Sequence, residues 1–462
     1  MFTESWNSLT THANPQWLRD AKFGIYTHWG IYSVHARGPN TTWYAHHLYK
    51  GHPPEVKYHT EHFGPLEKFG YTDFIPLFTA EKFDPDEWAE IFHDAGAKFA
   101  GPVAEHHDGF SMWRTSLNTL NSYEMGPKRD VVAELAKSYR AKDMKYMVAL
   151  HHAENYWYFQ NVPNTDSMNP QYEEMFNKEK IWPKKKFYDI WLAKNVELID
   201  RFSPDMMWFD FGLAAVPDAY KRKFLSYYYN RALEANKEVA INYKNRDMIV
   251  GSGVIDLELG RFMDIMYHEW ITDSTVDDGQ AWGYMHNATY KSAGDLIHYL
   301  VDNVSKNGYL LLNVGPRADG TIPEEAMKTL AGIGKWLRLN GEAIYQTTPW
   351  YAAQEGPTLM KTEGMFSESE KLTYTHEDIR YTAKDNVVYA TILARPSREA
   401  VLKNVARHLV EGEIESIRLL GFDKNLAYRV DGNEIRISMP DTIPGEHAYV
   451  LKIARKPAFG AL

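Results

Sequence analysis

The chain has 462 residues, 44% of them hydrophobic, which is enough for one large domain and a smaller one. Its formal net charge of −10 argues against a nucleic-acid partner, because such proteins normally present a basic face. The absence of cysteine excludes disulfides, thiolate metal sites and a cysteine nucleophile.

No uninterrupted apolar stretch has the length of a membrane span, and residues 1–5 lack the basic and apolar regions of a signal peptide. We expect a periplasmic or secreted location if a signal peptide has been removed, and a cytoplasmic location otherwise.

From Phe23 to about Leu339, short apolar runs alternate with amphipathic stretches. The repeated strand–helix units predict a parallel sheet, and about eight of them predict a (β/α)₈, or TIM, barrel. A doubly wound open sheet is the main alternative, although no glycine-rich fingerprint follows the first strand. The seven predicted strands are 23–27, 98–104, 145–150, 206–209, 239–241, 263–267 and 309–312. The predicted helices are 86–96, 131–141, 187–202, 218–235, 295–305 and 326–339.

Beyond residue 350 the pattern changes to short apolar runs separated by turn residues, which predicts a C-terminal β-sandwich domain. The predicted domains are therefore 1–350 and 351–462. The runs lie at 371–375, 386–394, 414–420, 427–430 and 448–453.

Carboxylates follow two of the predicted strands. Asp210 ends the apolar run 206–209, and Glu269 follows the predicted strand 263–267. A retaining glycosidase holds a nucleophile and an acid/base about 5–5.5 Å apart, and an inverting enzyme holds its pair about 6.5–9.5 Å apart. The structural alternatives are a helix cap for Asp210 and a loop salt bridge for Glu269. Asp256 and Glu258 compete with Glu269 for the acid/base role.

Histidines cluster at the same predicted strand ends. They suit either a metal or hydrogen bonds to the hydroxyls of a polyol, and we favour the polyol because spaced metal-ligand motifs are missing. Adjacent residues on a strand point to opposite faces, so each His-His pair is expected to place one ring in a shared site. Trp43 and Trp282, in predicted loops above the barrel, are candidates for stacking on sugar. The histidines are His28, His106, His107, His151, His152 and His268.

Several motifs, in order along the chain, resemble the α-L-fucosidases of glycoside hydrolase family 29. They are Lys22–Val34, Glu105–Phe110, Trp208–Asp210, Ser305–Asn313, Gly341–Tyr345 and Pro349-Trp350. The resemblance implies a barrel followed by a β-sandwich. It also implies retaining hydrolysis of terminal α-L-fucosides of fucosylated glycans, without a metal or other cofactor.

By this resemblance, Asp210 corresponds to the nucleophile and Glu269 to the acid/base. The residues expected to bind substrate are His28, Trp43, His106, His107, His152, Lys244 and Trp282.

Three positions depart from the family pattern. Thr42 stands where many members have glutamate, His151-His152 where many have two tyrosines, and Lys244 where arginine is frequent. These departures leave two alternatives, an α-L-galactosidase and a non-catalytic fucose-binding barrel. The histidine cluster leaves a third, a metal-dependent barrel hydrolase. The sequence does not specify the linkage, the natural glycan or the oligomeric state.

Overall fold

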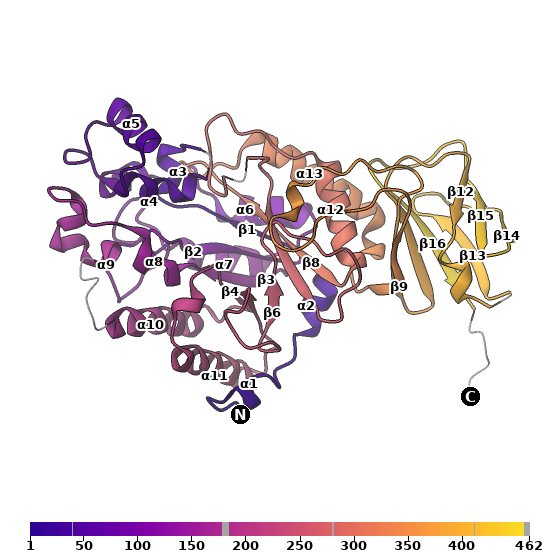
Figure 1. Ribbon diagram of the computed structural model, residues 1–462, viewed down its shortest axis with the longest axis horizontal. Helices are drawn as coiled ribbons and strands as arrows, with labels where there is room; N and C mark the ends of the chain where they lie inside the picture. The colour runs from indigo at the N-terminus through magenta and orange to yellow at the C-terminus, as the bar shows by residue number, and fades with distance from the viewer. Residues whose placement is uncertain (39, 178–183, 280, 411, 457–462) are drawn as a thin grey trace.

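The computed structural model describes residues 1–38, 40–177, 184–279, 281–410 and 412–456. Two regions follow each other along the chain (Figure 1). The first is a closed barrel of eight parallel strands surrounded by helices, and the second contains two antiparallel sheets. The predicted (β/α)₈ barrel with a C-terminal β-domain is therefore confirmed.

The barrel strands follow each other in chain order, and the first closes the barrel by pairing in parallel with the last. Nearly all strand residues are buried, because helices cover the outside and side chains fill the interior. The strands are β1 (Phe23–Thr27), β2 (Phe99–Glu105), β3 (Lys145–Leu150), β4 (Met206–Trp208), β5 (Ala240–Lys244), β6 (Val254–Asp256), β7 (Trp270–Thr275) and β8 (Gly308–Val314).

Amphipathic helices cover the barrel. Side chains of Asp84, Asp130 and Ser292 accept hydrogen bonds from the first backbone amides of three of them, which explains where these helices begin. The covering helices are α6 (Pro85–Asp94), α7 (Val131–Ala141), α10 (Lys185–Phe202), α11 (Asp218–Glu234), α12 (Ala293–Ser305) and α13 (Glu324–Asn340).

Shorter helices occupy the chain start and the long connections that leave the C-terminal ends of β1 and β3. Before β1 lie α1 (Trp6–Leu9) and α2 (Gln16–Ala21). After β1 come α3 (Tyr32–His35), η1 (Thr41–Trp43), α4 (Tyr44–Tyr49), α5 (Pro53–His62) and η2 (Tyr71–Leu77). After β3 come α8 (His152–Tyr158), η3 (Asp166–Met168), η4 (Pro170–Tyr172) and α9 (Glu173–Phe176), and η5 (Leu213–Ala215) and η6 (Gly341–Ala343) complete the barrel region.

One predicted strand is wrong. Residues 263–267 form a loop between β6 and β7, and Tyr267 is 92% exposed. Their mostly apolar side chains resemble a short buried strand in the sequence. The sequence does not predict β6 or β7, the strands on either side of this loop, because neither is a long apolar run. β6 has only three residues, and β7 buries the polar residues 272–275.

The C-terminal region packs two antiparallel sheets around a single apolar core. One has the order β13-β16-β11-β10-β9 and the other β12-β15-β14. Four of the predicted runs overlap these strands, but 371–375 is not a strand. The predicted division at residue 350 falls within β9. The elements are β9 (Thr348–Glu355), η7 (Ser367–Ser369), β10 (Ile379–Lys384), β11 (Val387–Ile392), β12 (Glu399–Leu402), η8 (Ala406–His408), β13 (Ile414–Leu419), β14 (Tyr428–Asp431), β15 (Glu434–Ser438) and β16 (Tyr449–Arg455).

A buried ionic cluster joins the two regions where α12 packs against β9 and β10. Asp302 of α12 accepts from Lys306 Nζ at 2.8 Å and from Arg380 Nε of β10 at 2.5 Å. All three side chains are almost fully buried, so each charge depends on the others for compensation. Among the described residues, no helix combines the length and apolar character needed to cross a bilayer.

Candidate active site

A cavity of about 250 Å³ opens at the C-terminal ends of the barrel strands. This is the end at which TIM barrels carry their active sites. Its floor is formed by strand-end residues and its rim by the loops that follow. The lining residues are Tyr26, His28, Asn40, Thr42, Trp43, His106, His151, Trp208, Asp210, Phe211, Glu258, Asp273, Trp282 and Phe366.

Lys244, the last residue of β5, is fully buried and lies among four carboxylates. Its Nζ is 3.2 Å from Asp210 Oδ1 and 2.8 Å from Glu258 Oε2. It also lies 3.4 Å from Asp273 and 3.7 Å from Asp256. Because one nitrogen contacts both, Asp210 Oδ1 and Glu258 Oε2 are at most about 6 Å apart.

Asp210 is held as a carboxylate. Burial alone would raise its pKa, but Lys244 and the neighbouring His107 and His151 hold the pKa well below the usual range of an aspartate. Its Oδ2 lies 3.3 Å from His107 Nε2. His107 Nδ1 donates to the His151 carbonyl at 3.0 Å, so both ring nitrogens of His107 face acceptors.

That arrangement requires a doubly protonated His107. Burial lowers the pKa of His107, but the hydrogen bond and the charge of Asp210 outweigh burial and raise it. Asp210 therefore faces two cations, Lys244 and His107.

Glu258 has the opposite environment. Burial, and then repulsion from Asp210 and Asp273, outweigh Lys244 and raise its pKa to about 7. It lies in the loop after β6, whose backbone is fixed by hydrogen bonds from Leu257 and Leu259 to carbonyls of β7. The cavity thus holds one ionised carboxylate beside one that takes up a proton near neutral pH.

Asp256 and Asp273 form a second pair of carboxyl groups around Lys244, and Asp273 also lines the cavity. Burial and the Asp256 charge raise the pKa of Asp273 well above its ordinary value, whereas burial raises that of Asp256 to about 6. Tyr26 donates to Asp273 at 3.0 Å, and Trp208 Nε1 donates to Asp256 at 3.0 Å. A protonated Asp273 reduces the negative charge around Lys244, the cation that contacts all four carboxylates.

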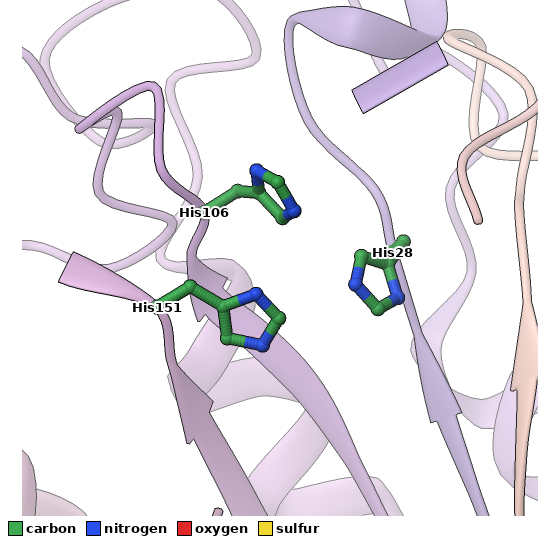
Figure 2. A group of neighbouring side chains, drawn as sticks. All are labelled: His28, His106 and His151. Atoms are coloured by element: carbon green, nitrogen blue, oxygen red, sulfur yellow. The ribbon is translucent and has the colours of Figure 1, made fainter. Parts of the chain in front are cut away.

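Three histidine rings converge on the cavity from different strand ends. Figure 2 shows His28 opposite His106 and His151, and the centroid of the His28 ring lies 5.4 and 5.3 Å from the centroids of their rings. Burial lowers the pKa of His28 to about 4 and lowers those of His106 and His151 well below normal, so all three are neutral at pH 7. Neutral imidazoles can both accept and donate hydrogen bonds to hydroxyl groups.

The tautomer of His28 is set by Asn313 of β8. His28 Nδ1 lies 2.8 Å from Asn313 Oδ1, which only accepts, so Nδ1 carries the proton and Nε2 is an acceptor. The Asn313 amide also donates to the Trp282 carbonyl at 2.7 Å. A single buried amide therefore orients both a ring and a wall of the cavity.

Within the part of the chain that the structure describes, two groups of side chains have the donor types of a metal site. They are His28, His106 and His151, and His107, His151 and Asp210, with ligand atoms in each group within 4.8 Å of one another. In the second group His107 uses both nitrogens for other hydrogen bonds and is protonated, so it is a poor ligand. The first group has the donor types that suit zinc.

Most of the sequence-predicted site residues come together here. Asp210, His28, His106, Trp43 and Trp282 line the cavity. His107 and Lys244 contact Asp210 from below. The two adjacent rings of His106 and His107 both reach the site because β2 ends at Glu105, so strand alternation no longer separates them.

The structure contradicts the acid/base prediction for Glu269. This residue directly precedes β7, so it lies at the N-terminal end of that strand, away from the cavity. There it forms an ion pair with Arg19 and accepts from Asn14 at 2.7 Å. The error follows from the incorrect strand at 263–267, which made Glu269 a strand-end residue. The competing candidate, Glu258, occupies the site instead.

The substrate-binding prediction for His152 is also wrong. His152 does not line the cavity; its Nδ1 donates to the buried Glu105 carboxylate, and its ring stacks on that of Phe187, with the ring centroids 4.9 Å apart. Its neighbour His151 lines the cavity, so one ring of this pair enters the site, although β3 ends at Leu150 and the pair begins α8 in place of continuing the strand.

Several lining residues were missed as site residues. The sequence gives one indication for Asp273, a carboxylate beside Ser and Thr, but it does not predict the strand on which Asp273 lies. For Phe366 the sequence gives none, because this residue lies in the C-terminal region, far from the barrel in sequence.

Comparison with known proteins assigns this site to a family. Residues 1–342 match the family model for α-L-fucosidase, and residues 373–454 match that for the α-L-fucosidase C-terminal domain. The chain belongs to the α-L-fucosidase family. The resemblance drawn from the sequence motifs is confirmed, as is its assignment to the glycoside hydrolases.

Relatives in this family align over almost the whole chain. The chain is 32% identical to the tissue α-L-fucosidase of Rattus norvegicus over 468 residues, covering 98% of this chain and 93% of the relative. It is 30% identical to the human tissue α-L-fucosidase, covering 98% and 91%. The crystal structure of the Thermotoga maritima α-fucosidase in complex with fucose superposes with a TM-score of 0.79 at 29% identity, covering 98% of this chain and all of that one.

Proposed function

We propose that this α-L-fucosidase family member removes terminal α-L-fucosyl residues from fucosylated glycans by double displacement, with Asp210 as nucleophile and Glu258 as acid/base. The observation that carries the proposal is the contact of both carboxylates with Lys244 Nζ. The resulting limit of about 6 Å matches a retaining pair and leaves too little room for the water of an inverting one.

In the first step an Asp210 oxygen attacks the anomeric carbon and the bond to the leaving oxygen breaks. Glu258 transfers its proton to that oxygen, which departs as a hydroxyl of the glycan. In the second step the Glu258 carboxylate takes a proton from water, and the water oxygen displaces Asp210 from the anomeric carbon. The product is fucose with its original α configuration, and both carboxyl groups return to their starting states.

The histidines and aromatic residues would select the sugar. The neutral rings of His28, His106 and His151 suit hydrogen bonds to its hydroxyls, and Trp43 and Trp282 offer an apolar wall for its C6 methyl group. The Thermotoga maritima relative has been crystallised with fucose and with a mechanism-based inhibitor, which supports the same substrate and a covalent intermediate for this chain.

The test is hydrolysis of 4-nitrophenyl α-L-fucoside beside α1,2-, α1,3-, α1,4- and α1,6-fucosylated oligosaccharides, with NMR of the first-formed anomer. We expect α-fucose first, and Asp210→Ala should reduce kcat to below about a thousandth while its circular dichroism stays unchanged. Initial release of β-fucose, or full activity of the variant, would refute the mechanism. The corresponding α-L-galactoside measures discrimination at C6, and binding without turnover would indicate a non-catalytic barrel.

A further inference from the structure

A segment of the C-terminal region returns to the mouth of the barrel cavity. It follows β9 and reaches the loop after β6, where four backbone hydrogen bonds join the two, three of them short. Phe366 N donates to the Glu258 carbonyl, Glu368 N to that of Leu259 and Gly364 N to that of Arg261, each at 2.8 Å. This segment lies between the two regions that match the family models, which end at 342 and resume at 373.

The segment is anchored by one side chain. Both carboxylate oxygens of Glu368 accept from Ser274 Oγ, at 2.9 and 2.8 Å, and Lys291 Nζ donates to Glu368 at 2.7 Å. The Glu368 and Lys291 side chains are only about a tenth exposed, and Ser274 follows the cavity residue Asp273 on β7. Polar contacts of this kind, largely shielded from water, keep the segment in place against the barrel.

The segment held by Glu368 places Phe366 at the cavity. Phe366 lines the cavity together with Glu258 and Trp282, yet the residue is 50% exposed. Its backbone has φ 62°, in the left-handed region, which is unfavourable for a residue with a bulky side chain. A strained, half-exposed aromatic at the rim of a cavity is the arrangement expected for a ligand contact rather than for core packing.

The position of Glu258 indicates which part of the substrate Phe366 meets. A general acid must lie on the side of the leaving oxygen, since it protonates that atom. Phe366 is bonded through its amide to Glu258 itself, so it lies on the side from which the leaving sugar extends. We propose that Phe366 is a specificity-determining residue that stacks on the sugar to which fucose is attached.

The partner is a pyranose that presents a face of C–H groups, such as a galactose or an N-acetylglucosamine unit. This inference rests on the proposed function, because it takes Glu258 as the acid. It assigns to the C-terminal region a direct contact with substrate, on the aglycone side of the bond that is cut.

The test compares two substrates that share the fucosyl group. One is the fucosyl disaccharide that the wild type cleaves best, and the other is α-L-fucosyl fluoride, whose leaving group is too small to reach Phe366. For Phe366→Ala we expect kcat/KM to fall about tenfold on the disaccharide and to stay unchanged on the fluoride. The inhibition constant of free L-fucose should also stay unchanged, and Phe366→Tyr should restore the disaccharide activity.

Two further variants serve as controls for the fold and for the position of the aromatic ring. Phe366→Gly removes the ring but suits the left-handed backbone, so it should show the same selective loss even if the alanine variant folds poorly. Tyr351→Ala removes another exposed aromatic of the C-terminal region that does not line the cavity, and it should change neither substrate. Equal losses on both substrates, or no loss on the disaccharide, would overturn the proposal. A wild type that cleaves neither substrate would overturn the proposed function itself.

Discussion

Replacing Glu258 with glutamine removes the transferable proton but preserves the shape of the side chain. Lys244 keeps its contacts with Asp210, Asp273 and Asp256, at 3.2, 3.4 and 3.7 Å, and the new amide oxygen can still accept from it. The charge on Asp210 and the packing of the site should therefore survive, so the kinetic effect reports on proton transfer.

The expected size follows from that role. General acid catalysis contributes about 10²–10⁴-fold, which corresponds to about 2.7–5.4 kcal/mol of transition-state stabilisation. Glu258→Gln should lose that factor in kcat/KM on a fucosyl disaccharide, whose leaving oxygen needs a proton. On α-L-fucosyl fluoride the first step should be far less affected, and added azide should replace water in the second step and form α-fucosyl azide.

The matched control is Glu269→Gln. Glu269 contacts Arg19, whose side chain is 42% exposed, at the opposite end of the barrel, so its loss should cost at most about 1 kcal/mol of stability. Its kcat/KM should stay within about twofold of wild type on both substrates. The reasoning is refuted if Glu269→Gln shows the leaving-group-dependent loss and Glu258→Gln does not.

Three further predictions follow from the same contacts. Because Glu258 must be protonated to act as the acid and its pKa is raised to about 7, kcat/KM should fall as pH rises through that value, and a pH profile of Glu258→Gln should lack this limb. Asp302→Asn leaves Lys306 and Arg380 buried without their counter-charge, so urea unfolding should show a loss of about 3–5 kcal/mol; a loss below about 1 kcal/mol would contradict the role of this cluster. Dialysis against EDTA should leave kcat/KM unchanged, since the proposed steps need only carboxylates; a loss restored by zinc would favour the metal-dependent alternative and the group of His28, His106 and His151.

The sequence predicts the barrel best where a strand buries apolar side chains on both of its faces, or a helix buries them on one face. The strands 23–27 and 145–150 and the helix 131–141 have the predicted bounds, because their apolar patterns reflect real burial. The prediction fails between β5 and the end of β7, where loops join three strands in place of helices and β7 buries polar side chains that serve the site. In β7, polar residues that serve the site stand where apolar residues would otherwise be, so the hydrophobic pattern from which a strand is predicted is missing.

The same distinction explains the site. Asp210 and the histidines at 28, 106 and 107 could be predicted, because each follows a well-marked strand and belongs to a motif typical of the family. Glu258 entered only as a competitor, since its strand is three residues long. The choice between His151 and His152 depends on the direction of each side chain, which local sequence does not specify. Phe366 reaches the cavity only because a segment of the C-terminal region returns to the barrel, which local sequence does not specify either.

The two carboxylates have different proposed roles, nucleophile and acid/base, because different charged groups surround them. Both contact Lys244, so that lysine alone cannot make one an anion and the other an acid. Asp210 has the additional charge of His107, whose pKa is raised by its hydrogen bond to Asp210 and by the Asp210 charge, whereas Glu258 has neighbouring carboxylates. The pKa of one group is therefore lowered and that of the other is raised, although they share a single ammonium. On this reasoning His107 is a positioning residue for the charge of Asp210, and the identity of the nucleophile is decided at the end of β2 as much as at the end of β4.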